Sequence, residues 1–195
     1  MNLPTWACNV LGIYNIHESG PYSYWYNFLT SNIQQLDGDV VEIGVFKGRT
    51  FCSTCSVLAQ SAPNKVVWGF DSFSGFPNVN HPFDQIDRFK FLFLNGYISQ
   101  AHYDSHLFNL ELLSVLGKPL DVQYLSSSLN FSATSEDLVR RKLSYLNLEN
   151  FKLIKGDVSS TIYIDPLPDL IAAVFLDADM YEPYLHTLSS LWSRL

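Results

Sequence analysis

The feature that most constrains the fold is an apolar run that passes into a glycine-spaced turn and then into a helical pattern. The run 40–43 is apolar apart from Glu42, and Gly44 and Gly48 follow it before the helical pattern begins near Thr50. Glycines let the backbone pass close to a ligand, and the first turn of a helix presents free N–H groups to that ligand. This order of elements is typical of the nucleotide-binding corner of α/β proteins.

Length and composition predict a single domain. A chain of 195 residues with 47% hydrophobic content is long enough to bury one ordinary core. We therefore expect one domain over 1–195, with an N-terminal helical segment at 1–37. The net charge of −7 and the lack of a long basic cluster argue against nucleic acid or an anionic membrane as a partner. A small molecule fits this composition better.

The cysteines and the start of the chain predict a cytoplasmic protein. Three cysteines give no paired disulfide framework, and the first residues lack the pattern of a signal peptide. No apolar stretch approaches the ~20 residues that span a bilayer. Cys52 and Cys55 have the spacing of a redox pair, but they lie inside the helical pattern at 50–60. We interpret them as buried thiols.

Apolar runs alternate with helical patterns along most of the chain, which predicts a mostly parallel sheet with helices on both faces. Strands are expected at 40–43, 66–70, 151–154 and 172–176, with helices at 22–36, at 50–60, after Thr134 and around Pro183. In the last helix we expect Leu185, Leu188 and Trp192 to point inward. The fourth strand would be an unpaired edge, so we expect either later strands outside this sequence or a homo-oligomer that covers the edge.

The segment from Asn78 to Ser128 interrupts this alternation. It contains an apolar run at 89–94 and leucines at helical spacing over 107–116. It is too long for a simple connection between elements. We expect a lid or substrate-shaping insertion at 78–128 that folds over the mouth of the sheet.

Acidic residues follow the ends of the predicted strands. Asp71, Asp157 and Asp177 each come where an apolar strand ends. Because the carboxyl ends of parallel strands share one edge of the sheet, we expect these side chains to converge beyond the glycine turn. An acidic residue at the tip of the second strand is the acceptor that a ribose diol requires. Glu42, inside an apolar run, needs hydrogen bonds from the turn or from a cationic ligand group.

The pair Asp177 and Asp179, separated by Ala178, is open to two interpretations. A carboxylate at a strand tip can bind a hard divalent cation, which lowers the pKa of a substrate hydroxyl. The same spacing resembles the DxD motif with which many glycosyltransferases hold a metal and a sugar diphosphate. The spacing alone does not choose between them.

Four segments taken in order resemble class I S-adenosylmethionine-dependent methyltransferases: EIGVFKGRT, VVWGFDSFSGFP, LIKGDVSSTI and VFLDADMYEPYLHTL. They are similar, more narrowly, to the macrocin O-methyltransferase family, metal-dependent enzymes that methylate sugar hydroxyls of natural products. The resemblance covers 38–195 apart from the insertion, and WGFDSFSGFP and LDADMYE are its most specific pieces. It implies a Rossmann-like class I methyltransferase fold that here lacks its last strands.

The resemblance also implies a set of site residues, which are Glu42, Gly44, Gly48, Asp71, Ser72, Asp157, Val158, Asp177 and Asp179. The first three would form the cofactor loop beside the methionine part of S-adenosyl-L-methionine. Asp71, with Ser72 beside it, would take the ribose hydroxyls, and Asp157 with its neighbour would border the adenine. Asp177 would be a catalytic ligand of Mg²⁺, and Asp179 a general base or a neighbour of the metal site. In the family, an acidic pair after the next strand completes that site.

The leading hypothesis is therefore a methyltransferase acting on a hydroxyl of a small acceptor, a sugar or natural-product glycoside. A metal-dependent glycosyltransferase using Asp177 and Asp179 is one alternative. A non-catalytic, truncated methyltransferase-like module that works through its exposed edge is another. A dinucleotide-dependent oxidoreductase fits less well, because the turn is Gly44-x-x-x-Gly48 and not G-x-G-x-x-G.

Overall fold

The centre of the protein is a four-stranded sheet with the order β3-β2-β1-β4. The computed structural model describes residues 3–18, 20–77, 79–125, 130–164 and 166–195. All neighbouring strands run parallel. The strands are β1 (Asp39–Ile43), β2 (Val67–Asp71), β3 (Phe151–Lys155) and β4 (Ile171–Leu176). The chain winds outward from β1 to β3 and then returns to the other side of β1, so a ligand crevice is expected at the carboxyl ends of β1 and β4.

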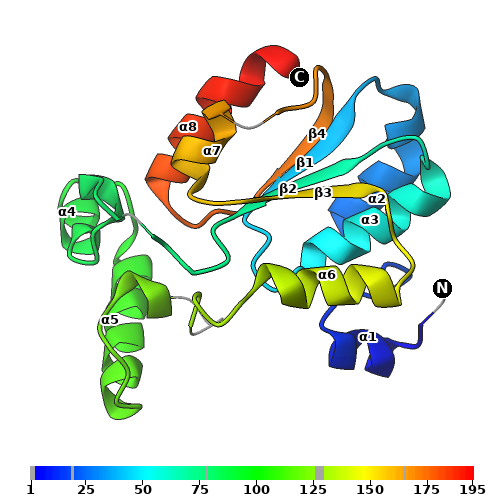
Figure 1. Ribbon diagram of the computed structural model, residues 1–195. Helices are drawn as coiled ribbons and strands as arrows, with labels where there is room; N and C mark the ends of the chain where they lie inside the picture. Colours follow the sequence, from blue (N-terminus) through cyan, green and yellow to red (C-terminus); the bar gives the residue numbers. More distant parts are fainter. Residues whose placement is uncertain (1–2, 19, 78, 126–129, 165) are drawn as a thin grey trace.

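Helices cover both faces of the sheet (Figure 1). One face carries α2 (Ser23–Asn32), α3 (Arg49–Ser61) and α6 (Glu136–Tyr145), and the other carries α7 (Val158–Ile164) and α8 (Tyr181–Leu191). Successive residues of β1 point to opposite faces, so Val40 is buried in one core cluster and Val41 in the other. The doubly covered α/β sheet predicted from the sequence is confirmed.

The N-terminal segment consists of α1 (Thr5–Leu11), α2 and the short 3₁₀ helix η1 (Ile33–Gln35). Trp25 anchors α2, because its indole Nε1 donates a hydrogen bond to Thr54 Oγ1 of α3 over 3.0 Å. Lys142 of α6 anchors the loop after α1. Its buried ammonium donates to the Gly12 carbonyl at 3.0 Å and to the Lys47 carbonyl, in the glycine turn, at 2.8 Å. The segment thus braces the turn that follows β1.

The insertion is helical and projects from the side of the sheet where the strands end (Figure 1). It contains η2 (Pro82–Asp84), α4 (Arg88–Leu94), α5 (Gln100–Val115) and η3 (Val122–Tyr124). Its expected end points, Asn78 and Ser128, lie outside the described residues. Stacked rings join α4 to α5, with centroids 3.9 Å apart for Phe89 and His106 and 4.9 Å for Phe93 and Tyr103.

The rotation of α8 differs from the sequence prediction. Leu185, Leu188 and Trp192 were expected to be inward, but they are 45%, 48% and 72% exposed. The side chains that face the sheet and α7 are one position earlier: Tyr184, Thr187 and Leu191. The prediction was wrong because both stripes have helical spacing, and packing against α7 selects between them.

The three cysteines are buried and unpaired, as expected for structural thiols. Burial raises the pKa of the Cys52 thiol to about 12. Cys52 and Cys55 are therefore packing residues of α3 and not a reactive pair. Among the described helices, none is long and apolar enough to cross a membrane.

Candidate functional site

The glycine turn after β1 packs directly against the end of β4. Gly44 has φ of +88°, and a Cβ added to it would lie 2.0 Å from the Asp177 carbonyl oxygen. Gly48 has φ of +74°, and its Cβ would lie 3.0 Å from the Val139 side chain of α6. In this structure the space beside each glycine is filled by the protein itself. The glycines are required first to close the corner, and this close packing places Asp177 beside the turn.

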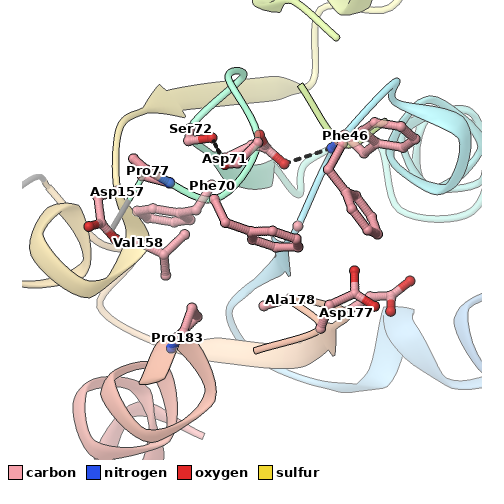
Figure 2. Close-up of a pocket in the computed structure, with 15 residues that line it drawn as sticks. Phe46, Phe70, Asp71, Ser72, Pro77, Asp157, Val158, Asp177, Ala178 and Pro183 are labelled. Atoms are coloured by element: carbon pink, nitrogen blue, oxygen red, sulfur yellow. Dashed lines mark hydrogen bonds between the residues drawn. The ribbon is translucent and has the colours of Figure 1, made fainter. Parts of the chain in front are cut away.

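A hollow at the carboxyl ends of the strands brings most of the expected site residues together, and we name it the strand-end hollow (Figure 2). The expected residues that line it are Gly44, Asp71, Ser72, Asp157, Val158, Asp177 and Asp179. Glu42 and Gly48 lie outside its lining. The three acidic strand ends thus meet at one edge of the sheet, as the parallel order predicts.

Asp71 is fixed by the backbone around it. Its Oδ2 accepts a hydrogen bond from the Phe46 N–H at 2.7 Å, drawn in Figure 2, and its Oδ1 accepts from the Phe73 N–H at 2.6 Å. Burial raises the pKa of the Asp71 carboxyl, and these backbone donors partly offset that rise. A carboxylate has about four lone-pair sites, and the backbone donors to Asp71 do not occupy all of them, so Asp71 can still accept a hydrogen bond from a diol in the hollow.

Glu42 is a buried carboxyl that accepts no hydrogen bond from the residues that the structure describes. Its side chain is 1% exposed, and neither oxygen has a partner within the described part of the chain. Burial, followed by the charges of Asp177 and Asp71, raises the pKa of Glu42 well above its ordinary value. A buried carboxyl in this state favours a cation or a hydrogen-bond donor beside it, because an unpaired buried polar group costs free energy.

A second hollow lies on the other side of Phe46, and we name it the basic hollow. It has a volume of about 380 Å³ and includes Lys47, Arg49 and Lys142 in its lining. Gly44, Phe46 and Asp177 line both this hollow and the strand-end hollow, so the two are neighbours. The Arg49 guanidinium lies 4.3 Å from the centroid of the Tyr14 ring, which also lines the basic hollow.

Asp179 occupies an unusual backbone conformation next to Asp177. Its φ is +59°, in the left-handed region that non-glycine residues rarely adopt. Burial, and then the charge of Asp177, raises the pKa of Asp179 to about 6. Burial also raises the pKa of Asp177, with Tyr22 acting in the opposite direction.

The described residues do not supply a complete site for the expected Mg²⁺. Within the ranges that the structure describes, no group of three or more His, Cys, Asp or Glu side chains is placed to hold a metal ion. Asp177 and Asp179 both line the strand-end hollow, but a hard divalent cation takes about six oxygen ligands. The side chains described at these strand ends therefore do not fit the expected Mg²⁺.

A third hollow lies between the insertion and the start of α8, and we name it the insertion hollow. Its volume is about 460 Å³, and most of the side chains that line it are aromatic or aliphatic. Phe76, Phe131 and Asp179 line both it and the strand-end hollow. The Phe76 and Phe131 rings, with centroids 4.8 Å apart, belong to the wall that the two hollows share.

Sequence reasoning missed several residues of these hollows. Arg49 follows Gly48 directly in the EIGVFKGRT segment, and Phe46 lies between the two glycines of the turn. Their positions in the glycine turn could therefore have identified them as residues of the site. Phe131 gave none. It lies 85 positions after Phe46 in the chain (131 minus 46), and only the fold brings their ring centroids to 5.6 Å.

A parallel sheet with this order, and with a ligand hollow beyond the ends of β1 and β4, defines a Rossmann-like class of protein. Residues 28–114 match the model of the macrocin-O-methyltransferase (TylF) family. This match includes the glycine turn and Asp71, and it continues into the insertion as far as α5. It confirms the resemblance to the macrocin O-methyltransferase family that the motifs indicate, and it extends that resemblance into the first part of the insertion.

Solved structures agree with this fold. The O-methyltransferase NovP aligns with a TM-score of 0.60 at 24% sequence identity, covering 88% of this chain and 59% of NovP. The calicheamicin methyltransferase CalS11 aligns with a TM-score of 0.54 at 20% identity, with the same two coverages, 88% and 59%. This chain thus spans about 59% of the length of each of these structures. A sequence comparison with curated proteins gives no match.

Proposed function

We propose that this protein is an O-methyltransferase that transfers the methyl group of S-adenosyl-L-methionine to a hydroxyl of a small acceptor, a sugar or natural-product glycoside. The observation that carries the proposal is Glu42, a carboxyl buried two positions before Gly44 to which no described residue gives a hydrogen bond. The ammonium group of the cofactor is the kind of donor that would satisfy it. The family match over the same turn and over Asp71 supports this choice of cofactor.

The two neighbouring hollows suggest how the cofactor would lie. Its adenosine would occupy the strand-end hollow, with the ribose on Asp71 and the adenine beside Asp157 and Val158. Its methionine part would pass the junction at Phe46 into the basic hollow. There the Arg49 guanidinium and the free N–H groups at the start of α3 would receive the carboxylate.

The reaction needs alignment more than activation, because the sulfonium already activates the methyl group. When bound, S-adenosyl-L-methionine would supply the methyl group: the acceptor oxygen would bond to the methyl carbon as the carbon–sulfur bond broke, and S-adenosylhomocysteine would be released. The protein's part is to hold oxygen, carbon and sulfur in line and to exclude water. Asp179, which lines both the strand-end and the insertion hollows, is the proposed base for the hydroxyl proton. The acceptor would then occupy the insertion hollow, in a single domain whose insertion at 78–128 shapes specificity.

Calorimetric titration with S-adenosylhomocysteine tests the proposal. We expect binding by the wild-type protein and at least a tenfold loss of affinity in Asp71→Ala, which removes the ribose acceptor. The matched control is Asp137→Ala, an exposed residue of α6 whose ion pair with Arg141 is on the surface. Absence of binding in the wild type would refute the proposal. Metal-dependent binding of a nucleotide sugar in its place would favour a glycosyltransferase.

A further inference from the structure

Asp84 joins the insertion to the start of α8. It belongs to η2, and its side chain is only 8% exposed. Its Oδ1 accepts a hydrogen bond from the Tyr181 N–H at 2.6 Å, and its Oδ2 accepts from the Glu182 N–H at 3.0 Å. These are the first two residues of α8, whose own N-cap residue, Met180, provides no side-chain bond. The N-terminal cap of this helix therefore comes from a residue almost one hundred positions earlier.

The cap lies at one end of the turn that carries Asp179. The turn begins where the Asp177 N–H donates to the Ile43 carbonyl at 2.9 Å, which ties it to β1. It tightens where the Met180 N–H donates to the Ala178 carbonyl at 2.6 Å. It ends at the two amides that Asp84 holds. The left-handed residue Asp179 is thus fixed from the sheet on one side and from the insertion on the other.

Aromatic contacts support the same junction. The centroid of the Tyr181 ring lies 4.6 Å from that of His81 and 4.9 Å from that of Phe83, and both rings come shortly before Asp84 in the chain. The Arg88 guanidinium lies 4.3 Å from the Phe83 centroid. Phe83, Asp84, Arg88 and Tyr181 all line the insertion hollow, as does Asp179. A change at this junction would therefore affect both the lining of the insertion hollow and the turn that carries Asp179.

We propose that Asp84 is a positioning residue that holds the insertion hollow and Asp179 in one fixed arrangement. The proposal rests on the proposed function, because it assigns the acceptor to the insertion hollow. The acceptor would touch the insertion, whereas the base would come from the turn after β4. Methyl transfer requires the acceptor hydroxyl and the base to be aligned with each other. A displacement of about 1 Å can reduce a rate by about 10²-fold. Asp84 would hold this alignment through its hydrogen bonds to the Tyr181 and Glu182 amides at the end of the turn.

The test compares Asp84→Ala and Asp84→Asn with Asp121→Asn. Asp121 is an exposed residue of the same insertion that caps η3 through the Gln123 N–H at 2.9 Å and forms no bond to α8. Amide hydrogen exchange is followed for the segments 82–94 and 177–185, with and without S-adenosylhomocysteine. In Asp84→Ala we expect exchange to rise at least tenfold in both segments together. Asp84→Asn, which keeps one acceptor oxygen, should restore part of the protection, and Asp121→Asn should change neither segment.

A second readout separates positioning from simple helix capping. Transfer of a tritiated methyl group to hydroxylated phenyl glycosides should fall at least tenfold in kcat for Asp84→Ala, while the affinity for S-adenosylhomocysteine stays within threefold. Asp84→Asn carries the test if the alanine variant does not fold. Unchanged exchange at 177–180 would overturn the proposal, as would a kcat equal to that of the wild type. Failure of the wild type to bind S-adenosylhomocysteine would instead reject the proposed function. The hydrogen-exchange result would then still test whether Asp84 holds the insertion and the turn at 177–180 together.

Discussion

At Glu42 the requirements of folding and of ligand binding oppose each other. The carboxyl is buried without a partner among the described residues, so the folded protein prefers it protonated and its pKa is raised. The unfolded chain has the ordinary glutamate pKa of about 4.3. The folded state therefore binds this proton more tightly. The stability that Glu42 contributes is present below the unfolded pKa and is lost as pH rises through the raised folded value.

We therefore predict opposite effects of Glu42→Gln on stability and on binding. At pH 8 the variant should be more stable than the wild type, because no charge is buried, and its stability should vary less between pH 5 and pH 8. Its affinity for S-adenosylhomocysteine should fall at least tenfold, because an amide no longer pairs with the ammonium group. Urea unfolding at the two pH values and calorimetry measure these effects. Equal affinity in both proteins would contradict the assigned role of Glu42.

Two glycines allow the steric cost of an added Cβ to be distinguished from the cost of a left-handed backbone. Gly44→Ala would place a Cβ 2.0 Å from the Asp177 carbonyl oxygen, at a φ of +88°. Gly96 is the matched control, since its φ is +72° but nothing lies within 4 Å of an added Cβ. We expect Gly96→Ala to cost about 1 kcal/mol, from the left-handed backbone alone. Gly44→Ala should cost at least twice as much, because β1 and β4 must move apart. Similar unfolding free energies for the two variants would contradict this steric account.

The sequence predicted the residues whose positions follow from strand ends. Asp71, Asp157 and Asp177 meet in one hollow because parallel strands present their carboxyl ends at one edge. Phe131 was missed because it follows the insertion, and its contact with Phe46 exists only after that segment has folded back. Asp84 was missed for the same reason, since no local pattern indicates that its partner amides lie in α8.

At the scale of elements, one buried cation, Lys142, connects α6 to two loops. Lys142 Nζ donates to the carbonyls of Gly12 and Lys47, which belong to two different loops. Burial lowers the pKa of Lys142. The cost of burying this ammonium is offset by its hydrogen bonds to these two carbonyls. The residue thus links α6, the N-terminal segment and the glycine turn.

Lys142→Met should therefore destabilise the protein by about 2 kcal/mol, because it leaves two carbonyl groups without their donor while keeping most of the apolar volume. Arg141→Met is the control on the same helix, since its ion pair with Asp137 is exposed and should contribute less than about 1 kcal/mol. Chemical denaturation measures both changes. A loss for Lys142→Met no larger than that of the control would show that the two loops are held by other contacts.

The elements themselves were predicted to within a residue or two wherever apolar periodicity was strong, as in β1, β2 and α3. The rotation of α8 was not, because Leu185 and Leu191 both belong to stripes with helical spacing. The choice between the stripes depends on α7, which packs on the same face, and on the cap that Asp84 supplies from the insertion. These contacts are tertiary, so they cannot be predicted from the spacing of apolar residues within α8.

At the scale of the whole molecule, this rotation leaves one side of α8 as an apolar surface. Leu185, Leu188 and Trp192 form one exposed face of α8 and the turn after it, and Ile164 at the end of the neighbouring α7 is also exposed. β4 pairs only with β1 among the described strands, so its other edge is free of strand partners there. Exposed apolar faces and open strand edges both favour association of chains.

We therefore predict that the protein of this sequence self-associates through α8 as its concentration rises. Leu188→Lys and Trp192→Lys should each weaken the association, since burying an ammonium group in an apolar contact costs more than exposing it. Val10→Lys is the control, an exposed apolar residue of α1 outside this face. Sedimentation velocity over a concentration series gives the measurement, and calorimetry with S-adenosylhomocysteine should show equal affinity in all three variants. Association that is weakened as much by Val10→Lys as by the α8 variants would show that the net charge of the chain, and not this face, governs it.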